Sequence, residues 1–472
     1  MAAVAVIGAG LTGLTTAYRL KQQGSRVVVY EASERIGGSI KSVRRDGYLA
    51  ELGPSSLAAP SPRVATLLAD LGLSGSQLSS SSGARNRYIV RRGRLLRLPT
   101  SPSELLTSRL LSNGAKLAVF GEPLLDAGDS PQEESVAAFV RRRFNQEVLD
   151  YIVNPMVGGI FAGDPEQLSV RHATPRLHAM ERSHGSVMKA LVQGWKAQRD
   201  GRAPAGMGAV VSFQSGLQEI PDALGRELVS EVRLKAPVTQ VRKGSNGWTV
   251  GAAFQTPELF DAVVYAGPAH CLNEIDLDLE GSERLSTLAS IFHPPVAVVA
   301  LGFSRAHVAH PLDGFGFLSP EVERKRVLGA VFSSSLFPDR APEGHVLITA
   351  FVGGTRDPDL VQADPQTLTA RVIDDLRGLL GISGEPTFRT VQIWPKAIPQ
   401  YVLGYGRFKE IAENAERRNP GLVLAGTYRD GVSLGDAIAS AEQASTRVLE
   451  FLALARTEAR EPDRGVTAAG TD

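Results

Sequence analysis

The stretch GAGLTG at residues 8–13, together with an acid at Glu31, is the first part of the sequence whose residue types and spacing can do chemistry. Gly8 permits a tight turn, Gly10 lets a pyrophosphate group approach the backbone, and Gly13 lets a helix pack closely on a strand. The N-terminus of a helix stabilises phosphate charge, and the Glu31 carboxylate can accept hydrogen bonds from a ribose. The pattern therefore predicts a dinucleotide site, although an acid in this place is compatible with both NAD and FAD.

Three elements must position these residues. The apolar run VAVI (4–7) predicts a buried strand, LTTAYRL (14–20) has the spacing of a helix, and VVVY (27–30) predicts a second strand. Strand, glycine turn, helix, strand and acid thus follow one another within about thirty residues. A lone glycine motif is weak evidence, whereas this order of elements indicates a nucleotide-binding βαβ unit.

Further glycine-rich stretches favour FAD over NAD. EASERIGGSIKS (31–42) has an arginine four residues after the acid and then a pair of glycines, and ELGPSS (51–56) is another glycine turn with two hydroxyls. Together with LVLAGTYRDGVSLGDAIASAEQAS (422–445), a strand, a glycine loop and a helix, they resemble the flavin-dependent amine oxidase and protoporphyrinogen oxidase superfamily. The resemblance implies that this last helix points its N-terminus at the flavin ring, and that Val238 lies beside the adenosine.

The predicted cofactor is therefore FAD, and Arg35 is expected to pair with its phosphate. The predicted FAD contacts are Gly8, Ala9, Gly10, Leu11, Thr12, Gly13, Glu31, Ala32, Arg35, Gly37, Gly38, Ser39, Gly53, Pro54, Ser55, Ser56, Val238, Trp394, Val432, Ser433 and Leu434.

The amino-acid composition excludes several other classes of function. The 472 residues are 43% hydrophobic and 21% charged, which is ordinary for a globular protein of about three structural units. The formal net charge of +1 argues against a general nucleic-acid binder. The single cysteine, Cys271, cannot form an intrachain disulfide and fits a reducing compartment, so a cytoplasmic protein is expected. No stretch reaches the roughly 18 consecutive apolar residues of a membrane-spanning helix.

The motifs and apolar patterns together predict an α/β fold with three parts. Residues 1–73, 205–284 and 418–455 are expected to form a discontinuous Rossmann-type FAD-binding domain, because its motifs lie far apart in the sequence. Residues 74–100 and 285–417 are expected to form a sheet-rich substrate-binding domain, beginning with a flexible connector at SGSQLSSSSG (74–83). A helical domain is expected at 101–204 and a disordered tail at 456–472.

Basic residues gather at two places. A predicted hairpin between residues 85 and 97 carries six arginines, with Gly93 in its turn. Arginine without lysine suits carboxylate or phosphate recognition, although most of these side chains are expected to be solvated. Arg141-Arg142-Arg143 falls on an amphipathic helix. Such a helix either packs against its own domain, which we favour, or lies on an anionic membrane surface, so peripheral membrane contact is left open.

Within the superfamily the resemblance is closest to the protoporphyrinogen oxidases, and it covers nearly the whole chain. Local sequence alone predicts a glycine turn, a stop at Asp-Pro and a new helix for GGIFAGDPEQLS (158–169). This stretch is similar to a segment that walls the porphyrinogen pocket in that family, and RNRYIV (85–90) resembles the stretch whose arginine pairs with a propionate. DGFGFL (313–318), LGAVFSS (328–334), TAFVGG (349–354) and WPKAIPQY (394–401) are similar to further pocket and flavin segments. The implied substrate contacts are Arg87, Gly159, Phe315, Gly316, Leu318, Val331 and Phe351.

The resemblance implies an enzyme of porphyrin and heme biosynthesis that oxidises protoporphyrinogen IX to protoporphyrin IX, with FAD as cofactor and dioxygen as acceptor. A hydride would leave a ring-bridging methylene for the flavin N5. No catalytic histidine or carboxylate stands out, and no general base is assigned, because the cofactor performs the difficult step. Coproporphyrinogen III, with four propionates instead of two, is the alternative substrate; extra basic groups in the pocket would favour it, and the arginines between residues 85 and 97 are one source of them.

Other chemistries have less support. His307 and His310 lack a third ligand, so no metal site is predicted. Neither a GxSxG nucleophile elbow nor a P-loop occurs. An amine oxidase and a flavin-binding carrier without enzymatic activity are weaker alternatives, since the pocket segments are intact and Cys271 lies far from the C-terminal flavin segment. A homodimer is left open.

Overall fold

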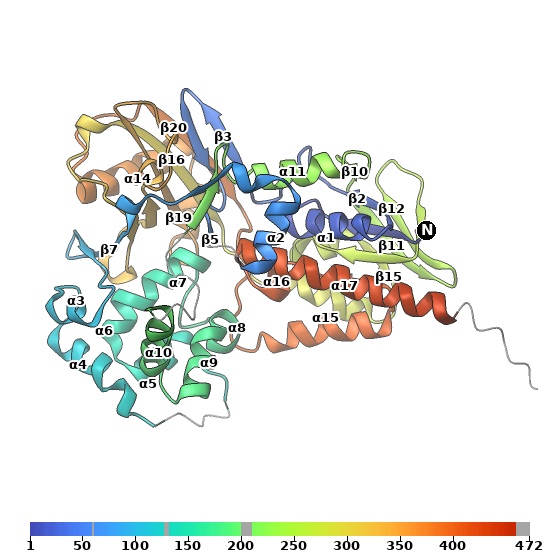
Figure 1. Ribbon diagram of the computed structural model, residues 1–472, viewed down its shortest axis with the longest axis horizontal. Coiled ribbons are helices and arrows are strands. Elements are labelled where there is room, and N and C mark those ends of the chain that lie inside the picture. The colour runs from blue at the N-terminus through green and yellow to red at the C-terminus, as the bar shows by residue number, and fades with distance from the viewer. Residues whose placement is uncertain (59–60, 127–131, 200–209, 459–472) are drawn as a thin grey trace, which may run out of the picture.

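A computed structural model of the chain describes residues 1–58, 61–126, 132–199 and 210–458. It has three parts with their own cores: a parallel sheet with helices, a larger mixed sheet, and a group of helices (Figure 1). The α/β fold expected from the sequence is confirmed. The tail expected at 456–472 begins inside a helix that ends at Glu458, and its remaining residues lie outside the described part.

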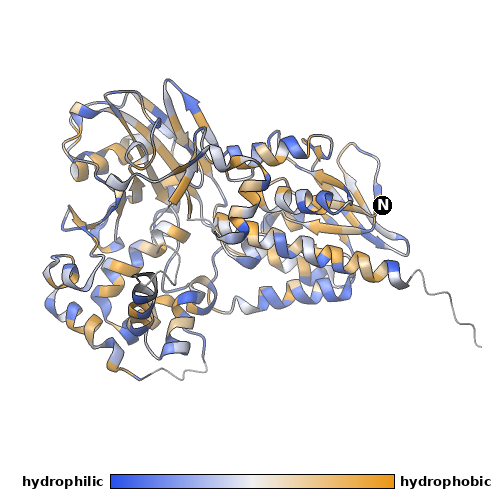
Figure 2. Cartoon of the chain, in the orientation of Figure 1, coloured by the Kyte–Doolittle hydropathy of each residue, from blue (hydrophilic) through white to orange (hydrophobic). Residues whose placement is uncertain are grey.

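The parallel sheet contains the strands that flank the nucleotide motif. Its strands stand in the order β10, β2, β1, β14, β21, and each neighbouring pair is parallel. Both faces of the sheet are covered, which explains the near-continuous hydrophobic runs of its strands (Figure 2). The strands are Val232–Arg233 (β10), Arg26–Tyr30 (β2), Ala3–Ile7 (β1), Ala262–Tyr265 (β14) and Leu422–Leu424 (β21).

Helices from both ends of the chain cover one face of this sheet. The helix α1 (Leu11–Gln22) packs beside α17 (Leu434–Glu458), with α2 (Pro62–Asp70) and α11 (Glu219–Glu227) in the same layer. Thr16 Oγ1 donates a hydrogen bond of 3.4 Å to Ala441 O, and Arg19 forms an ion pair of 2.7 Å with Glu442. The first and last helices are therefore joined by polar contacts as well as by apolar packing.

A second sheet covers the opposite face. Its strands, in order, are Glu258–Phe260 (β13), Gly247–Ala252 (β12), Val238–Gly244 (β11) and Asp276–Asp278 (β15). The helices α12 (Ser282–Leu285) and α15 (Gly406–Arg418) lie in the same layer. The sequence prediction places most of α15 in the substrate-binding domain, but its buried Phe408, Ala412 and Ala415 belong to the core beneath the parallel sheet. The other domain limits stay predictions.

The mixed sheet has seven strands in the order β20, β16, β19, β18, β17, β7, β8. All neighbouring pairs are antiparallel except β17 and β7, which are parallel. The helix α14 (Pro365–Leu380) packs on one face, and the short α13 (Ser333–Leu336) follows β18. The strands are Phe388–Trp394 (β20), Val296–Ser304 (β16), His345–Gly353 (β19), Val327–Val331 (β18), Gly314–Leu318 (β17), Asn86–Arg91 (β7) and Arg94–Arg97 (β8).

Two small sheets complete the strands. One pairs β3 (Ser42–Arg45) with β4 (Tyr48–Glu51), and the other has β9 (Val210–Phe213) between β5 (Leu57–Ala58) and β6 (Gln77–Ser79). The strand β6 lies inside the stretch 74–83, for which the sequence predicts a flexible connector. That prediction is wrong, because the backbone of this stretch is paired with β9.

The helical part contains eight α-helices within residues 102–126 and 132–199. Apolar side chains from most of them form one core. Among the described residues, no helix combines the length and apolar character that crossing a bilayer requires. The helices are Pro102–Thr107 (α3), Asn113–Gly121 (α4), Val136–Arg143 (α5), Gln146–Val148 (α6), Asn154–Phe161 (α7), Val170–Ala173 (α8), Pro175–His184 (α9) and Val187–Arg199 (α10).

Candidate active site

The glycine turn between β1 and α1 forms an open cradle. Gly8 has φ +103°, a conformation that side chains rarely tolerate, and a Cβ atom on Gly13 would lie only 1.9 Å from Gly8 O. At Gly10 the space is open, since the nearest atom to a Cβ there is Gly38 Cα at 4.0 Å. Gly10 also caps α1 without any side-chain hydrogen bond to the helix. The first-turn N–H groups thus lack a side-chain cap and face an open space, which suits a phosphate group.

The Glu31 carboxylate lies over this turn. Its Oε2 accepts a hydrogen bond of 2.8 Å from Ala9 N, and its Oε1 accepts one of 2.9 Å from Ser33 N. Glu31 O accepts from Ala236 N at 2.8 Å, which brings the buried Val238 close to the acid. Ala32 is exposed beside it. The carboxylate is thereby fixed where β2 ends, in the place from which a ribose would be bound.

The guanidinium of Arg35 organises the neighbouring glycine pair. It donates hydrogen bonds to Ile36 O at 3.2 Å and Ile40 O at 2.8 Å, and a further one to Gly38 O. Gly37 N donates to Ala9 O at 2.8 Å, so the pair lies directly against the first cradle. The sequence predicts a phosphate partner for Arg35, whereas the structure directs two of its nitrogens to carbonyl groups of its own loop. A phosphate contact from Arg35 stays a prediction.

The loop from Gly53 to Ser56 lies against the glycine pair and is tied to the mixed sheet. A Cβ atom on Gly53 would lie 1.9 Å from Ser39 O, so these two predicted cofactor residues are in direct backbone contact. The indole Nε1 of Trp394, at the end of β20, donates a hydrogen bond of 2.8 Å to Leu52 O. Pro54, Ser55 and Ser56 follow as half-buried residues.

The turn before α17 is also fixed in place. Ser433 and Asp436 cap the helix reciprocally: Asp436 N donates to Ser433 Oγ at 3.1 Å, and Ser433 N donates to Asp436 Oδ2 at 3.1 Å. Gly431 N donates to the Tyr401 hydroxyl at 2.9 Å. Val432 packs against the cores of both the parallel-sheet part and the helical part. The N-terminus of this helix is thus held between the two parts.

These features fit a dinucleotide flavin. The cradle at Gly10 and Gly38 has room for a pyrophosphate group, the α1 N-terminus offers N–H donors without a side-chain cap, and Glu31 offers an acceptor for a ribose. The loop at Gly53 and the turn at Val432 supply two further backbone segments tied to neighbouring parts of the fold. Among the described residues there is no group of three metal-ligating side chains.

The predicted substrate contacts lie on adjoining strands of the mixed sheet. Gly316 in β17 stands opposite Arg87 in β7 and opposite Val331 in β18. The Arg87 guanidinium carbon is 5.2 Å from the centre of the Phe315 ring, and burial lowers the pKa of this arginine. Phe315 and Phe351 pack together with Val331 in one small apolar cluster. The structure thus brings a half-buried cation and an apolar wall together on one face of the sheet.

The stretch GGIFAGDPEQLS is not the glycine loop that local sequence predicts. Gly158 and Gly159 lie inside α7, and the helix ends only at Phe161, followed by Ala162 with φ +49°. A π-helical turn at Leu149–Val153 precedes α7 and accommodates a proline at its start. A Cβ atom on Gly159 would lie 2.6 Å from Leu318 Cδ2. Gly159 therefore gives β17 room to pack against the helix, which joins the last predicted substrate residue to the wall.

The arginines of the β7–β8 hairpin do not gather in this wall. Arg91 forms an ion pair of 2.8 Å with Glu147, and Arg97 forms one of 3.1 Å with Asp313. The side chains of Arg85, Arg92 and Arg94 are exposed. Of the six, only Arg87 stands in register with Gly316. The additional cations that coproporphyrinogen would need are therefore not supplied by this hairpin.

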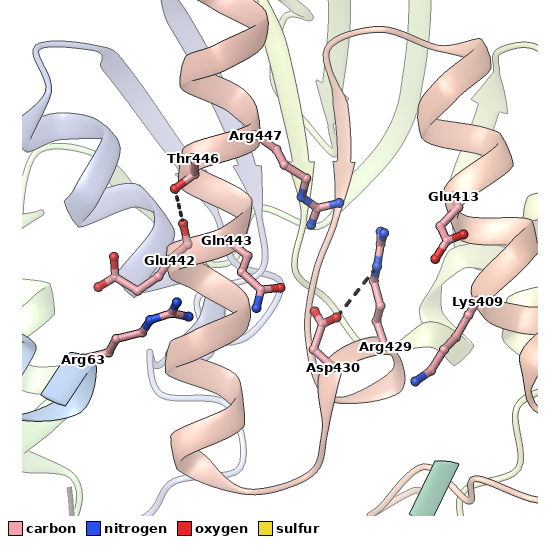
Figure 3. A pocket seen from close by; sticks show the side chains of 9 residues that line it. All are labelled: Arg63, Lys409, Glu413, Arg429, Asp430, Glu442, Gln443, Thr446 and Arg447. Atoms are coloured by element: carbon pink, nitrogen blue, oxygen red, sulfur yellow. Dashed lines mark hydrogen bonds and ion pairs between the residues drawn. The ribbon is translucent and has the colours of Figure 1, made fainter. Parts of the chain in front are cut away.

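Sequence reasoning missed Arg356 and a charged cavity. Arg356 lies next to the contact between α7 and β17, and a single arginine after a glycine pair gave no pattern to detect. The cavity, of about 740 Å³, lies between α15, α16 (Thr427–Asp430) and α17, away from the substrate wall (Figure 3). Its lining residues are Arg63, Lys409, Glu413, Arg429, Asp430, Glu442, Gln443, Thr446 and Arg447.

Comparisons with known proteins agree with this geometry. The family model described as flavin containing amine oxidoreductase matches residues 11–449. Protoporphyrinogen oxidase 2, chloroplastic/mitochondrial, of Arabidopsis thaliana is 36% identical, over 95% of this chain and 94% of that protein. The mitochondrial protoporphyrinogen oxidase of Nicotiana tabacum is 34% identical over 97% and 96% of the two chains, and a coproporphyrinogen III oxidase of Staphylococcus aureus is 30% identical over 95% and 99%.

A solved structure of a protoporphyrinogen oxidase candidate from Exiguobacterium sp. 255-15 has the same fold, with a TM-score of 0.80 at 23% identity, over 96% of this chain and 99% of that one. Reduced UDP-galactopyranose mutase follows with a TM-score of 0.73 at 16% identity, over 96% of each chain. The fold alone therefore occurs in proteins whose names give different activities. The family match nevertheless covers most of the sequence, and the chain belongs to the flavin-containing amine oxidoreductase family as a flavoprotein enzyme.

Proposed function

We propose that this enzyme oxidises protoporphyrinogen IX to protoporphyrin IX, with FAD as cofactor and dioxygen as acceptor. The observation that carries the proposal is the wall formed by Arg87, Phe315, Val331 and Phe351, a cation beside an apolar face of aromatic and aliphatic side chains. That combination suits an apolar tetrapyrrole macrocycle with carboxylate side chains. The names of the similar proteins from Arabidopsis thaliana and Nicotiana tabacum support the same substrate class.

The protein's part in this reaction is to bind and orient the macrocycle. Arg87 pairs with a propionate, because a half-buried guanidinium forms strong charge-assisted hydrogen bonds with carboxylates. Phe315 and Phe351 supply apolar contacts to the pyrrole rings and exclude water from the carbon to be oxidised. The chemistry that FAD would contribute when bound is the acceptance of a hydride from that carbon. Overall the substrate loses six electrons and six protons, and three dioxygen molecules become three molecules of hydrogen peroxide.

The hydrogen bond between Trp394 and Leu52 O connects the edge strand of the mixed sheet, which carries this wall on its other strands, to the cofactor loops. Because β20 belongs to the mixed sheet and Leu52 precedes Gly53, the hydrogen bond fixes the edge of the substrate sheet against the predicted flavin cradle. A substrate bound on the mixed sheet is thereby held at a defined distance from the cofactor, which hydride transfer requires.

The purified protein tests this function directly. We expect a yellow protein whose flavin absorbance bleaches when protoporphyrinogen IX is added without oxygen, and which yields fluorescent protoporphyrin IX and peroxide when air is admitted. A colourless protein, or flavin that stays oxidised with the porphyrinogen, would overturn the proposal. Bleaching by primary amines instead would assign the enzyme to amine oxidation.

We further propose a cytoplasmic protein that contacts the membrane surface through the helical part. Exposed apolar side chains gather on α3, α4 and the following turn, where Lys116 Nζ donates to Leu106 O at 2.8 Å and so links the first two helices. They are Leu106, Leu117, Phe120, Leu124 and Leu125. An exposed apolar group of this kind next to a lysine suits an anionic lipid surface. Flotation with anionic vesicles tests the membrane contact. Sedimentation of the purified protein without vesicles tests the homodimer that the sequence leaves open.

A further inference from the structure

Arg356 lies at the junction between α7 and the end of β17. The chain turns at Gly353 and Gly354 after β19, and Thr355 N donates a hydrogen bond of 2.8 Å to Ala162 O just beyond α7. The Arg356 side chain then reaches back, and its Nη1 donates a hydrogen bond of 3.0 Å to Ser319 O. A Cβ atom on Gly158 would lie 3.5 Å from Arg356 Nη2, so the guanidinium lies directly against the helix.

The charge of Arg356 is poorly compensated by the protein. Burial lowers the pKa of this arginine. The Glu321 carboxylate raises that pKa in part, but Glu321 is exposed and lies outside ion-pair distance. Within the described residues no carboxylate forms an ion pair with Arg356, and one of its five N–H groups has a hydrogen-bond acceptor there. A mostly buried cation in this state is unfavourable unless an anion or further acceptors complete its surroundings.

Arg356 adjoins the substrate wall. Ser319 directly follows Leu318, and Gly158 directly precedes Gly159, so the guanidinium lies next to the contact between Leu318 and Gly159. Arg87 stands opposite Gly316, three residues earlier in β17, which places the two arginines about 10 Å apart along the strand. Leu318 lies between these two positions along the strand, and the Phe315 ring lies beside Arg87.

We propose that Arg356 is a second carboxylate anchor of the substrate site, and that it lets this enzyme also oxidise coproporphyrinogen III to coproporphyrin III. This inference rests on the proposed function. Protoporphyrinogen IX has its two propionates on neighbouring pyrroles, so a molecule anchored at Arg87 presents vinyl groups to the far side. Coproporphyrinogen III has one propionate on each pyrrole, so the same orientation brings carboxylates to both arginines. The reaction is balanced as before: six electrons and six protons leave the macrocycle, and three dioxygen molecules become three molecules of hydrogen peroxide.

The test compares both porphyrinogens on the flavin-loaded enzyme and its variants. Arg356→Gln removes the charge, Arg356→Lys keeps it, and Arg94→Gln removes an exposed arginine at the hairpin turn as a matched control. We expect Arg356→Gln to lower kcat/KM for coproporphyrinogen III about tenfold or more, mainly through KM, because one charge-assisted pair is lost. Turnover of protoporphyrinogen IX should change less than about threefold, Arg356→Lys should restore part of the loss, and the control should behave as wild type.

The outcomes separate the two proposals. Equal losses for both substrates would show that Arg356 has a structural role only and would overturn the inference. A wild-type enzyme that oxidises protoporphyrinogen IX but not coproporphyrinogen III would also overturn it, while leaving the proposed function intact. Oxidation of neither porphyrinogen would instead contradict the proposed function.

A binding measurement covers the case in which the variants fail to fold. For each porphyrin the measured quantity is the loss of affinity when its carboxylates are converted to methyl esters. This loss should be larger for coproporphyrin III, compared with its tetramethyl ester, than for protoporphyrin IX, compared with its dimethyl ester. Equal differences for the two porphyrins would exclude a second anchor.

Discussion

The side chain of Leu318 occupies the space into which a side chain on Gly159 would project, with Cδ2 2.6 Å from the position of a Cβ atom there. Strand β17 and helix α7 are therefore matched at a single glycine, and the proposed substrate wall depends on that match. The backbone of α7 is therefore not open to a ligand at this point, because the side chain of Leu318 from β17 covers it.

A methyl group at Gly159 should therefore act through Leu318. We expect Gly159→Ala to raise KM for the porphyrinogen about tenfold, since overpacking of this size displaces neighbouring side chains. Leu318→Ala in the same chain should recover most of the loss by making room. Gly378→Ala, in a part of α14 where a Cβ atom meets nothing within 4 Å, is the control. Failure of the double variant to recover would assign Gly159 to direct ligand contact.

Gly10 and Gly13 should respond differently to the same substitution. A Cβ atom on Gly13 collides with Gly8 O at 1.9 Å, so Gly13→Ala should destabilise the fold and lower the yield of protein. A Cβ atom on Gly10 meets nothing closer than 4.0 Å, so Gly10→Ala should fold but bind flavin at least tenfold more weakly, because the methyl group fills the cradle. Circular dichroism and flavin titration separate the two effects. Normal flavin affinity in Gly10→Ala would contradict a phosphate site at this turn.

Trp394→Phe should loosen the cofactor loop. The substitution keeps an aromatic ring but removes the donor to Leu52 O, which costs about 1 kcal/mol or somewhat more if the carbonyl stays without a partner. We expect flavin to dissociate several times faster, with little change in the secondary structure. Stopped-flow measurement of flavin release checks this. An unchanged release rate would mean that the loop is held by its contact with Ser39 alone.

Glu51 should make stability depend on pH. Burial raises the pKa of this carboxyl from its ordinary 4.5 to about 7, against hydrogen bonds from Ser42 Oγ at 2.6 Å and Leu217 N at 2.8 Å. Because the folded-state pKa is the higher one, its stabilisation is complete below pH 4.5 and is lost as the pH rises through 7. The difference amounts to about 3 kcal/mol.

Glu51→Gln keeps an acceptor for Leu217 N–H and cannot ionise. Its melting temperature relative to wild type should therefore rise between pH 5 and pH 8, whereas Glu343→Gln, at an exposed position, should show no such trend. Parallel curves for Glu51→Gln and wild type across this range would contradict the raised pKa.

Arg87→Ala should weaken substrate binding without affecting the cofactor. We expect KM for protoporphyrinogen IX to rise about tenfold or more, as loss of a charge-assisted pair predicts, with kcat changing less. Flavin content should equal that of wild type, and the exposed Arg85→Ala should behave as wild type. Loss of flavin from Arg87→Ala would contradict its position on the substrate wall.

The cofactor end of the molecule could be predicted from sequence because its determinants are local. The order of β1, glycine turn, α1, β2 and Glu31 is contained in one short segment, and each glycine has the environment that its spacing implies. For Arg35 the structure shows contacts with carbonyl groups of its own loop, and its contact with a phosphate stays a prediction. These carbonyl contacts follow from the tight loop that the glycine pair forms, which local residue types do not reveal.

The substrate end depended on contacts between distant segments. Gly158 and Gly159 favour a turn by their own propensity, yet they lie inside α7, where the side chain of Leu318 from a distant strand fills the space beside Gly159. Residues 77–79 form a strand because β9, more than 130 residues later, offers a partner. Arg356 carries no local pattern at all, and its importance follows only from the burial and the neighbours that the fold gives it.

The pairing of α1 with α17 has a consequence for how the protein is made. Leu14 and Ala17 on α1 are fully buried, partly beneath a helix that begins only at Leu434. During synthesis the nucleotide-binding half must therefore wait, with apolar surface open to water, until nearly the whole chain has left the ribosome. A chain that terminates early would carry the complete glycine motif and still fail to close its core. We expect such a chain to be bound by chaperones or degraded by proteases before it can bind flavin.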